Sequence, residues 1–575
     1  MVQKIVVDPV TRIEGHLRVQ AVLGDDGVVQ DASCTSALFR GLELVLRGRD
    51  PREAWQIAER ICGVCTLVHA ITSVRAVEDA LEIEIPKNAN LIRNLMIAAE
   101  YVQDHVVHFY HLHALDWVDI TAALKADPKA TAELAQKISK WPKSSSGYFG
   151  DVQTRLKRFV ESGQLGIFAN AYWGHSAYKL PPEANLLAAA HYIEALAWQR
   201  ELVKVHAVFG GKNPHPNLIV GGVPCAINLE HPDAINIDKL SLVKAKIDEA
   251  IEVVEQMYLP DLLAVASFYK DWAKWGGGIS GKGVMDYGEF PVVSGDRSTH
   301  QWKGGALLDG KLDDIHDVDV RDPEQIQEFV SHSWYEYSEG DKVGVHPWDG
   351  ETKPKYSGPK PPFEYLETQE KYSWMKAPRW RGRAMEGGPL ARTLLALAHK
   401  DKEVQADVDE SLKRLDVPVQ AVFSALGRTL ARALETRRAA RMLKQSYEEL
   451  VANIKAGDTQ TANMEKWEPS TWPAGDLKGA GTYAAPRGAL AHWVRIENGK
   501  ITNYQAVVAT TWNGSPKDAA GQRGPMEEAL IGLPVQDPKQ PLEILRVIHS
   551  FDPCLACSTH VLDLRGTELA RVQVQ

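Results

Sequence analysis

Apolar and polar positions alternate at the start of the chain. Leu17, Val19 and Ala21 are separated by polar residues, which is the period of a half-buried strand. The stretch 24–27, Gly-Asp-Asp-Gly, is a turn signal, and the apolar pattern resumes at Val28 and Val29. The N-terminal region is therefore predicted to form strands joined by a turn.

From about residue 52 the apolar positions recur at helical spacing. Steps of three and four give one apolar face to a helix expected near residues 91–109, formed by Leu91, Leu95, Ala98, Val102, Val106 and Phe109. Further helices are predicted around 183–209, 238–270 and 389–455. Several long helices in one chain favour a central bundle.

The rest of the chain has a mixed pattern. Residues 275–380 are rich in Gly, Pro, Trp and Tyr, which predicts loops and short strands packed on the bundle. Residues 493–507 predict a hairpin around Asn498-Gly499, and residues 544–548 a short helix before Asp552. The predicted fold class is α+β, mainly helical, with a central long-helix bundle and β elements at the N-terminal and C-terminal regions.

These patterns divide the chain into consecutive regions. We expect an N-terminal β region, a helical bundle, an irregular β insertion, a second helical region, a C-terminal region that carries metal ligands, and a short tail: 1–50, 51–270, 271–388, 389–455, 456–560 and 561–575. The sequence contains no internal repeat and no low-complexity tract.

Composition narrows the functional classes. The 575 residues are 44% apolar and 24% charged, with a formal net charge of −10, which is ordinary for a globular protein. No basic patch of domain size is present, so nucleic acid is excluded as a partner. No apolar run reaches the length of a membrane span, and the first residues do not form a secretory signal. A chain of this kind can still be exported while bound to a partner that carries the signal.

Cysteine placement is the most informative feature. Four of the six cysteines form two C-x-x-C pairs, Cys62 with Cys65 and Cys554 with Cys557, whose facing members are 489 positions apart. Two intervening residues allow both sulfurs of a pair to bind one metal, and thiolates select zinc, iron–sulfur or other late transition metals. Spacing alone leaves three readings open: a structural zinc site, a redox metal, or two unrelated thiol pairs.

The flanking residues resolve this ambiguity through a family resemblance. Arg60-Ile-Cys-Gly-Val-Cys-Thr-Leu-Val-His69 and Asp552-Pro-Cys-Leu-Ala-Cys-Ser-Thr-His560 resemble the two signature motifs of nickel–iron hydrogenase large subunits. Further segments resemble the family in the family's order: Asp8–His16, Gly41–Glu43, Asn213–Asn217, Ala485–Gly488 and Tyr504–Thr511. The resemblance covers essentially the whole chain and is closest to the respiratory, uptake-type branch.

The resemblance implies a nickel–iron centre that cleaves H2 reversibly. All four thiolates would bind nickel, with Cys62 and Cys554 terminal. Cys65 and Cys557 would bridge to an iron that carries CO and two cyanide ligands. Metal ligation deprotonates thiols outright. Other proteins would have to make and insert the diatomic ligands and the metals.

The same resemblance assigns proton transfer and electrostatic roles. Heterolytic cleavage of H2 releases a proton that needs a base, and Glu14 matches the proton-transfer glutamate, acting with Cys557. Arg487, after Pro486 in a rigid turn, would lie over the metals. Arginine stays charged at any working pH, so we favour an electrostatic and positioning role over a role as base. Asp104 and Asp552 would orient its guanidinium. Thr510 would donate a hydrogen bond to a cyanide.

Three further sites follow from the resemblance. Glu43, His560 and the backbone at Ala506 would hold Mg²⁺ (or Fe²⁺), although a histidine ligand is unusual for magnesium. Val64 and Leu112 would narrow the passage for gas. A row of histidines, His105, His108, His111 and His113, occupies the helix that carries Asp104; it could bind a metal, line a proton path or form a polar helix face.

The family also implies partners. An endopeptidase would cut after His560 and remove a propeptide, 561–575, so the sequence as given would be the precursor. Only Cys34 and Cys225 remain to bind an iron–sulfur cluster, which needs about four ligands. A small iron–sulfur subunit would therefore carry the electrons, with His215 approaching its nearest cluster.

Location and two other functional classes remain open in the sequence. A membrane cytochrome or quinone-linked subunit could complete the complex, which would place the chain on the periplasmic side; a cytoplasmic location is the alternative. A hydrogen sensor with the same site is a second function, against which the C-terminal extension argues. A non-catalytic relative in a respiratory complex is a third, against which the retained cysteines argue.

Overall fold

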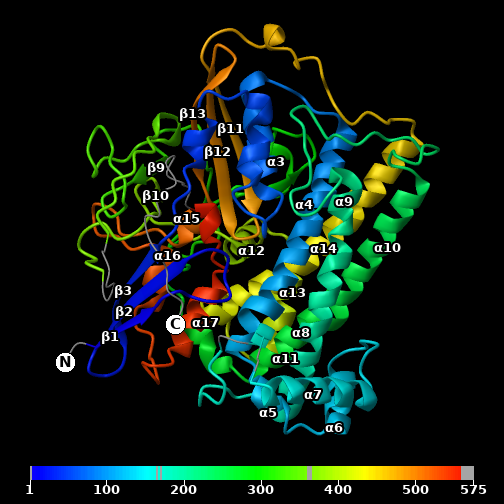
Figure 1. Cartoon of the computed structure of the whole chain (residues 1–575), viewed down its shortest axis with the longest axis vertical. Helices are drawn as coiled ribbons and strands as arrows, with labels where there is room; N and C mark the ends of the chain where they lie inside the picture. The colour runs from blue at the N-terminus through cyan, green and yellow to red at the C-terminus, as the bar shows by residue number, and fades with distance from the viewer. Residues whose placement is uncertain (1–2, 164–165, 169–170, 359–365, 559–575) are drawn as a thin grey trace.

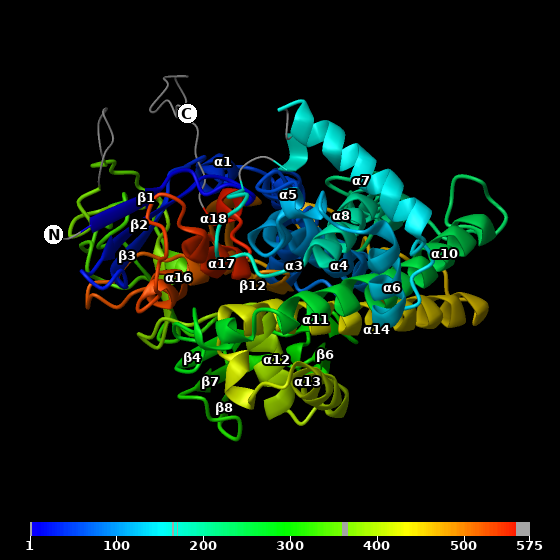
Figure 2. The ribbon, with the colours of Figure 1, turned by 90° about the horizontal axis from the view of Figure 1, so that it is seen from below.

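A computed structural model of the chain describes residues 3–163, 166–168, 171–358 and 366–558, with only the backbone described at Ile167, Cys557 and Ser558. The predicted N-terminal strands are confirmed and form an antiparallel sheet in the order β1-β2-β3 (Gln3–Val7, Leu17–Leu23, Val29–Ser36). The sheet lies beside the last helices of the described chain (Figures 1 and 2). The loop between β1 and β2 contains Glu14.

The long helices run alongside one another in the half of the molecule opposite the N-terminal sheet (Figure 1). Helix α4 (Lys87–Val107) packs on α14 (Ala425–Lys455), and α8 (Pro182–Leu202) and α10 (Ile237–Val253) lie beside them. The hydroxyl of Ser424 caps α14 by accepting from the Gly427 amide at 2.9 Å. Shorter helices connect and cover these four: α5 (Ile120–Ala123), α6 (Pro128–Ile138), α7 (Ser146–Glu161), α9 (Lys204–Gly210) and α11 (Leu259–Ser267).

Three predicted helical stretches contain breaks that the apolar period did not reveal. The stretch 389–455 forms three helices, α12 (Pro389–Ala398), α13 (Lys402–Leu415) and α14, because Lys400 and Asp416 adopt left-handed backbone angles. The stretch 238–270 passes through a π-helical turn at 254–258. Helix α8 ends before Val203, where α9 takes over.

The C-terminal region forms a second antiparallel sheet against which an early helix packs. The predicted hairpin is confirmed as β12 (Gly488–Glu497) and β13 (Lys500–Val507), and β11 (Leu477–Ala485) completes the sheet. Helix α3 (Val68–Leu81) lies directly on β11: a Cβ atom at Gly481 would stand 2.2 Å from the Thr72 carbonyl oxygen. This contact brings the first cysteine motif beside the C-terminal half of the chain.

The described residues between 275 and 380 form loops and short strands, as predicted. The strands pair as β4-β7-β8, β5-β6 and β9-β10, and all are antiparallel: Gly283–Asp286, Gly305–Leu308, Ile315–His316, Glu289–Pro291, His300–Trp302, Ile326–Phe329 and Ala377–Trp380. The remaining helices are short, and the predicted helix near 544–548 is among them: α1 (Leu42–Leu46), α2 (Ala54–Glu59), α15 (Ala509–Asn513), α16 (Pro525–Leu530), α17 (Leu542–Ser550) and α18 (Leu555–Ser558). Among the described helices, none combines the length and apolar character needed to cross a lipid bilayer.

Candidate metal centre

Three cysteine sulfurs from opposite ends of the chain meet in the interior. The Cys554 Sγ lies 3.4 Å from the Cys62 Sγ and 3.8 Å from the Cys65 Sγ, and all three residues are buried. A disulfide bond would be about 2.05 Å long, so these are separate thiols. Two sulfurs on a tetrahedral metal with bonds of about 2.3 Å stand roughly 3.8 Å apart. The three thiols therefore already have the spacing of ligands to one soft metal.

The loops that carry the cysteines are held against one another by backbone contacts. Cys62 and Cys65 lie in the turn between α2 and α3, and Cys554 lies between α17 and α18. The loop at Glu14 pairs with Cys554 in a parallel bridge, and the Leu555 amide donates to the Glu14 carbonyl at 2.8 Å. Gly15 has φ +83°, and a Cβ atom there would stand 2.7 Å from the Leu555 Cβ. Glycine at this position allows the two loops to touch.

Glu14 is a carboxylate in hydrogen-bond contact with one of the sulfurs. Its Oε2 accepts from the Cys554 Sγ at 3.1 Å and from the Ala556 amide at 2.8 Å. Burial and the nearby Cys62 thiol raise the pKa of Glu14 above its usual value. A carboxylic acid with a raised pKa, in contact with a metal-ligand cysteine, can take and release a proton. The contact is to Cys554; the predicted partner, Cys557, has a side chain outside the described residues.

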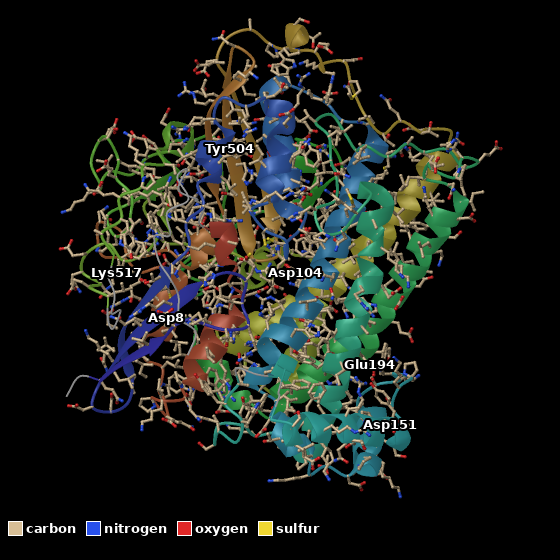
Figure 3. All side chains as sticks on the ribbon, in the orientation of Figure 1. Asp8, Asp104, Asp151, Glu194, Tyr504 and Lys517 are labelled. Atoms are coloured by element: carbon tan, nitrogen blue, oxygen red, sulfur yellow. The ribbon has the colours of Figure 1, made fainter. Side chains whose placement is uncertain are left out.

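Arg487 is fixed by the two acids that the sequence predicts. It donates from Nη1 to the Asp104 Oδ2 at 2.7 Å and from Nη2 to the Asp552 Oδ1 at 2.9 Å. Burial lowers the pKa of the guanidinium, but Asp104, Asp552 and the cysteines outweigh burial and raise it well above the usual value. Asp104 is labelled near the middle of the molecule, on α4, in Figure 3. A permanently charged, immobile cation therefore stands beside the thiols.

Thr510 and Pro486 contribute to the same wall of the site. The Thr510 hydroxyl accepts from the Cys554 amide at 3.1 Å, and the Pro486 carbonyl accepts from Arg392 at 3.0 Å. Both contacts hold backbone next to the thiols. The donation from Thr510 to a cyanide stays a prediction.

Two of the residues predicted to hold magnesium, Glu43 and Ala506, are in contact, and their role as metal ligands stays a prediction. The Glu43 Oε1 accepts from the Ala506 amide at 3.0 Å, and its Oε2 accepts a short hydrogen bond from the Thr352 hydroxyl. Glu43 is buried. The third predicted ligand, His560, lies outside the described residues, as does the cleavage point that follows it.

The residues predicted to line the gas passage or to face the partner subunit are all partly exposed. The Val64 side chain is 39% exposed, so this chain alone does not enclose it. Leu112 is half-buried, and its carbonyl accepts from Arg12 at 2.6 Å. His215 is half-buried beside the first cysteine loop: a Cβ atom at Gly63 would stand 3.7 Å from its ring Nε2, and its amide donates to Thr66. The roles of these residues stay predictions.

The helix histidines have four different sets of neighbours. His105 bonds to Glu435 at 2.9 Å, His108 to the His549 carbonyl at 2.7 Å, and His111 to the Tyr192 carbonyl at 3.1 Å. Of this row, only His113 stands with other candidate metal ligands, Asp116 and His549, among the described residues. The four histidines therefore do not converge on a shared metal.

Sequence reasoning missed two residues that hold the cysteine loops. Arg40 donates to the carbonyls of Arg60 and Ile61 in the first loop and to that of Ala556 in the second, the last at 2.9 Å. Glu100, one turn before Asp104, accepts from the Leu67 amide at 3.1 Å, and burial raises its pKa to about 8. For Glu100 the only signal in the sequence was a charged residue within an apolar helix pattern. For Arg40 it was the position next to Gly41-Leu-Glu43.

Soft sulfur donors suit nickel or zinc, and hard cations such as magnesium are disfavoured. The raised pKa of Glu14 and the fixed charge of Arg487 add proton transfer and electrostatic stabilisation to the metal ligands. A structural zinc site needs neither group. The fold and the site together define a metalloenzyme that couples soft-metal chemistry to proton movement.

Comparisons with known proteins identify the family. The nickel-dependent hydrogenase family matches residues 40–560, and a HoxL-like family matches residues 4–35. The uptake hydrogenase large subunit of Rhizobium leguminosarum bv. viciae is 58% identical over 584 residues, covering all of this chain and 98% of the relative. The hydrogenase-1 large chain of Escherichia coli (strain K12) is 53% identical over 583 residues, covering all of this chain and 97% of that chain.

Solved structures agree with this assignment. The Ni-Fe-Se hydrogenase from D. vulgaris Hildenborough in the as-isolated oxidized state superposes with a TM-score of 0.76 at 33% identity, covering 97% of this chain and 100% of that chain. The chain belongs to the nickel-dependent hydrogenase family. It is an enzyme, an oxidoreductase that acts on H2.

Proposed function

We propose that this chain is the catalytic large subunit of an uptake-type hydrogenase that converts H2 reversibly to two protons and two electrons. The proposal rests on one observation above all. Thiols separated by almost the whole length of the chain meet within bonding reach of one metal, with Glu14 bonded to one of them. Relatives named uptake hydrogenase large subunit, which are more than 50% identical to this chain, support its assignment to the uptake-type branch.

Four cysteines would hold the metals. Cys62, Cys65, Cys554 and Cys557 would bind nickel, with Cys65 and Cys557 bridging to an iron that carries CO and two cyanides. When bound, the nickel–iron centre supplies the heterolytic cleavage of H2. The sulfur spacings fit this donor set at the three cysteines whose side chains are described.

Glu14 would carry the proton released from H2 away from the cysteine sulfurs. Its Oε2 stands 3.1 Å from the Cys554 Sγ, which is hydrogen-bond distance, so a proton can cross without rearrangement. The raised pKa of Glu14 favours uptake of that proton. Cys557 would share this transfer.

Arg487 would stabilise negative charge and keep the site in shape. Its guanidinium is bonded to Asp104 and Asp552 and is buried, so it cannot swing away. A fixed charge needs no reorganisation during reaction. Thr510 and the Pro486 backbone would line the diatomic ligands. Val64 and Leu112 would narrow the gas route, and α4, α8, α10 and α14 would form the rigid central bundle that holds Asp104.

A second metal and several partners complete the proposal. Glu43, the backbone of Ala506 and His560 would hold Mg²⁺ (or Fe²⁺). An iron–sulfur small subunit would receive electrons near His215. Metal-insertion proteins would load the site, an endopeptidase would remove 561–575, and a membrane cytochrome or quinone-linked subunit would hold the complex at the periplasmic side. The regional division of the chain given above belongs to the same proposal.

Hydrogen-dependent dye reduction by the purified heterodimer tests this function. We expect rapid turnover together with bound nickel, and Glu14→Gln should lower the rate by a factor on the order of 10²–10⁴ with nickel retained, because an amide cannot take up the proton. Glu53→Gln is the matched control, since Glu53 is exposed and lies away from the thiols, at the start of α2. A heterodimer that binds nickel but turns over only slowly would be a sensor. A heterodimer without nickel would contradict the proposal.

A further inference from the structure

One buried carboxylate, that of Asp116, bonds to residues close in sequence to both Glu14 and Cys554. Asp116 follows the π-helical turn at 108–113 and is completely buried. Its Oδ1 accepts from the Arg12 Nη2 at 2.6 Å, and its Oδ2 accepts from the His549 Nδ1 at 2.6 Å. Burial acts to raise the pKa of Asp116, but Arg12, His549 and His113 outweigh burial and hold the pKa well below its usual value. Asp116 is therefore an anion with a hydrogen-bond donor on each oxygen.

The two partners of Asp116 lie in the Glu14 loop and on helix α17, which leads into the Cys554 loop. Arg12 is two residues before Glu14, and its Nη1 also donates to the Leu112 carbonyl at 2.6 Å. That carbonyl is near the end of the π-helical turn, where backbone acceptors lack partners within the helix. His549 lies on α17, five residues before Cys554, and its Nε2 donates to the Thr11 carbonyl at 2.8 Å. One carboxylate thus holds both loops.

These residues form a hydrogen-bonded hub and not another metal site. Both ring nitrogens of His549 face oxygen acceptors, the Asp116 carboxylate and the Thr11 carbonyl, so only the doubly protonated ring satisfies both. The guanidinium of Arg12 occupies the other oxygen of Asp116. The Arg546 Nε donates to the Asp116 carbonyl at 2.9 Å and adds further positive charge. A metal cation would have to displace these protons beside two arginines.

The proposed proton transfer depends on the distance between the Glu14 carboxylate and the Cys554 sulfur. The Glu14 loop and the Cys554 loop touch through short contacts: the Leu555 and Ala556 amides donate to Glu14, and the Cys554 thiol to its Oε2. Proton transfer is sensitive to displacements of a fraction of an ångström at such contacts. We propose that Asp116 is a positioning residue that keeps the Glu14 carboxylate in register with Cys554. This inference rests on the proposed function of Glu14.

Asp116→Asn tests the proposal with little change in volume. Asparagine can accept from Arg12 through its one oxygen, but its amide nitrogen cannot accept from the His549 Nδ1, so the contact through which Asp116 holds α17 is lost and only the bond from His549 to the Thr11 carbonyl still joins the two segments. In the nickel-loaded heterodimer we expect kcat for H2 oxidation to fall at least tenfold while KM for H2 stays within twofold. Hydrogen exchange measured by mass spectrometry should show at least tenfold faster exchange at the Leu555 and Ala556 amides. Normal kcat and normal exchange would overturn the proposal.

Asp119→Asn is the matched control. Asp119 is also buried and only three residues away, but its carboxylate caps α5 by accepting from the Thr121 amide at 2.8 Å and serves a different part of the fold. Asparagine can keep this cap, but its amide nitrogen cannot accept from the Gly174 amide, which now donates to the Asp119 Oδ2 at 3.0 Å. This variant should therefore lower the melting temperature without faster exchange at residues 555 and 556. The same exchange increase in this control would mean that any buried defect loosens the site, which would overturn the specific role of Asp116.

A second variant covers a failure of Asp116→Asn to assemble. Arg12→Met keeps much of the apolar stem of the side chain and removes the donor to the Asp116 Oδ1. Lower kcat with faster exchange at residue 555 supports the proposal, and an assembled Arg12→Met heterodimer with unchanged kcat and exchange overturns it. If the wild-type heterodimer neither binds nickel nor oxidises H2, the proposed function fails instead. The exchange comparison still reports in that case whether Asp116 holds the two loops together.

Discussion

Arg40 is the residue whose loss should most directly separate the two cysteine loops. Its guanidinium donates to the Arg60 and Ile61 carbonyls in the first loop and to the Ala556 carbonyl in the second. Arg40→Met keeps much of the length and apolar stem of the side chain and removes all the donors. The three carbonyls would then lose Arg40 as a donor.

The size of the effect follows from these bonds. A hydrogen bond to a charged group contributes roughly 1.5–3 kcal/mol, and the bond to the Arg60 carbonyl is exposed and worth less. Two partly buried bonds, discounted for solvent, give about 3 kcal/mol for holding the loops together. At about 1.4 kcal/mol per tenfold change, this corresponds to roughly a 100-fold shift toward the open arrangement.

Metal release by a chelator measures that shift. We expect nickel to leave the Arg40→Met heterodimer on the order of 100 times faster than the wild type, with a lower nickel content after purification. Arg49→Met is the control, because Arg49 is exposed and its guanidinium donates to the Val45 carbonyl within its own turn. Nickel content and release rate equal to those of the wild type in Arg40→Met would refute the idea that Arg40 joins the loops.

Three further predictions follow from individual contacts. Arg487→Lys, which cannot span Asp104 and Asp552, should lower kcat roughly 100-fold with nickel retained, measured by dye reduction. Gly15→Ala should reduce nickel content because its methyl meets Leu555, whereas Gly48→Ala, equally strained at φ +77° but with nothing within 4 Å, should not. Burial raises the pKa of Glu527 to about 7 from 4.5. The bound proton therefore stabilises the folded state fully below about pH 4.5, and this stabilisation is lost as the pH rises through about 7. The free energy of unfolding should fall by about 3 kcal/mol over this range. Glu527→Gln should abolish this part of the fall in melting temperature between about pH 5 and pH 8, and an unchanged pH dependence would contradict the assignment.

The strands, the hairpin and several helices follow from local patterns in the sequence. Alternation at residues 17–21 and the Asn498-Gly499 turn are local signals, and the structure confirms both elements. The breaks near Lys400 and Asp416 were missed, because a left-handed residue leaves the apolar period on either side intact. Helical spacing alone therefore joined three helices into one.

At the site, residue identities were predictable and contacts were not. The pairing of Arg487 with Asp104 and Asp552 follows the family resemblance and is present. The bond from Cys554 to Glu14 depends on how the first loop aligns with the last, to which Gly15 and Arg40 contribute. Neither residue carries a metal-binding signature. Their roles arise only when segments more than 400 residues apart in the sequence fold together.

The central claim is that cysteines from both ends of the chain bind one nickel. X-ray absorption at the nickel edge of the purified heterodimer tests it directly. We predict one nickel per chain with a first shell dominated by sulfur, and loss of a sulfur ligand in Cys554→Ser. A nickel shell made only of nitrogen and oxygen, or zinc in place of nickel in the active heterodimer, would contradict the account.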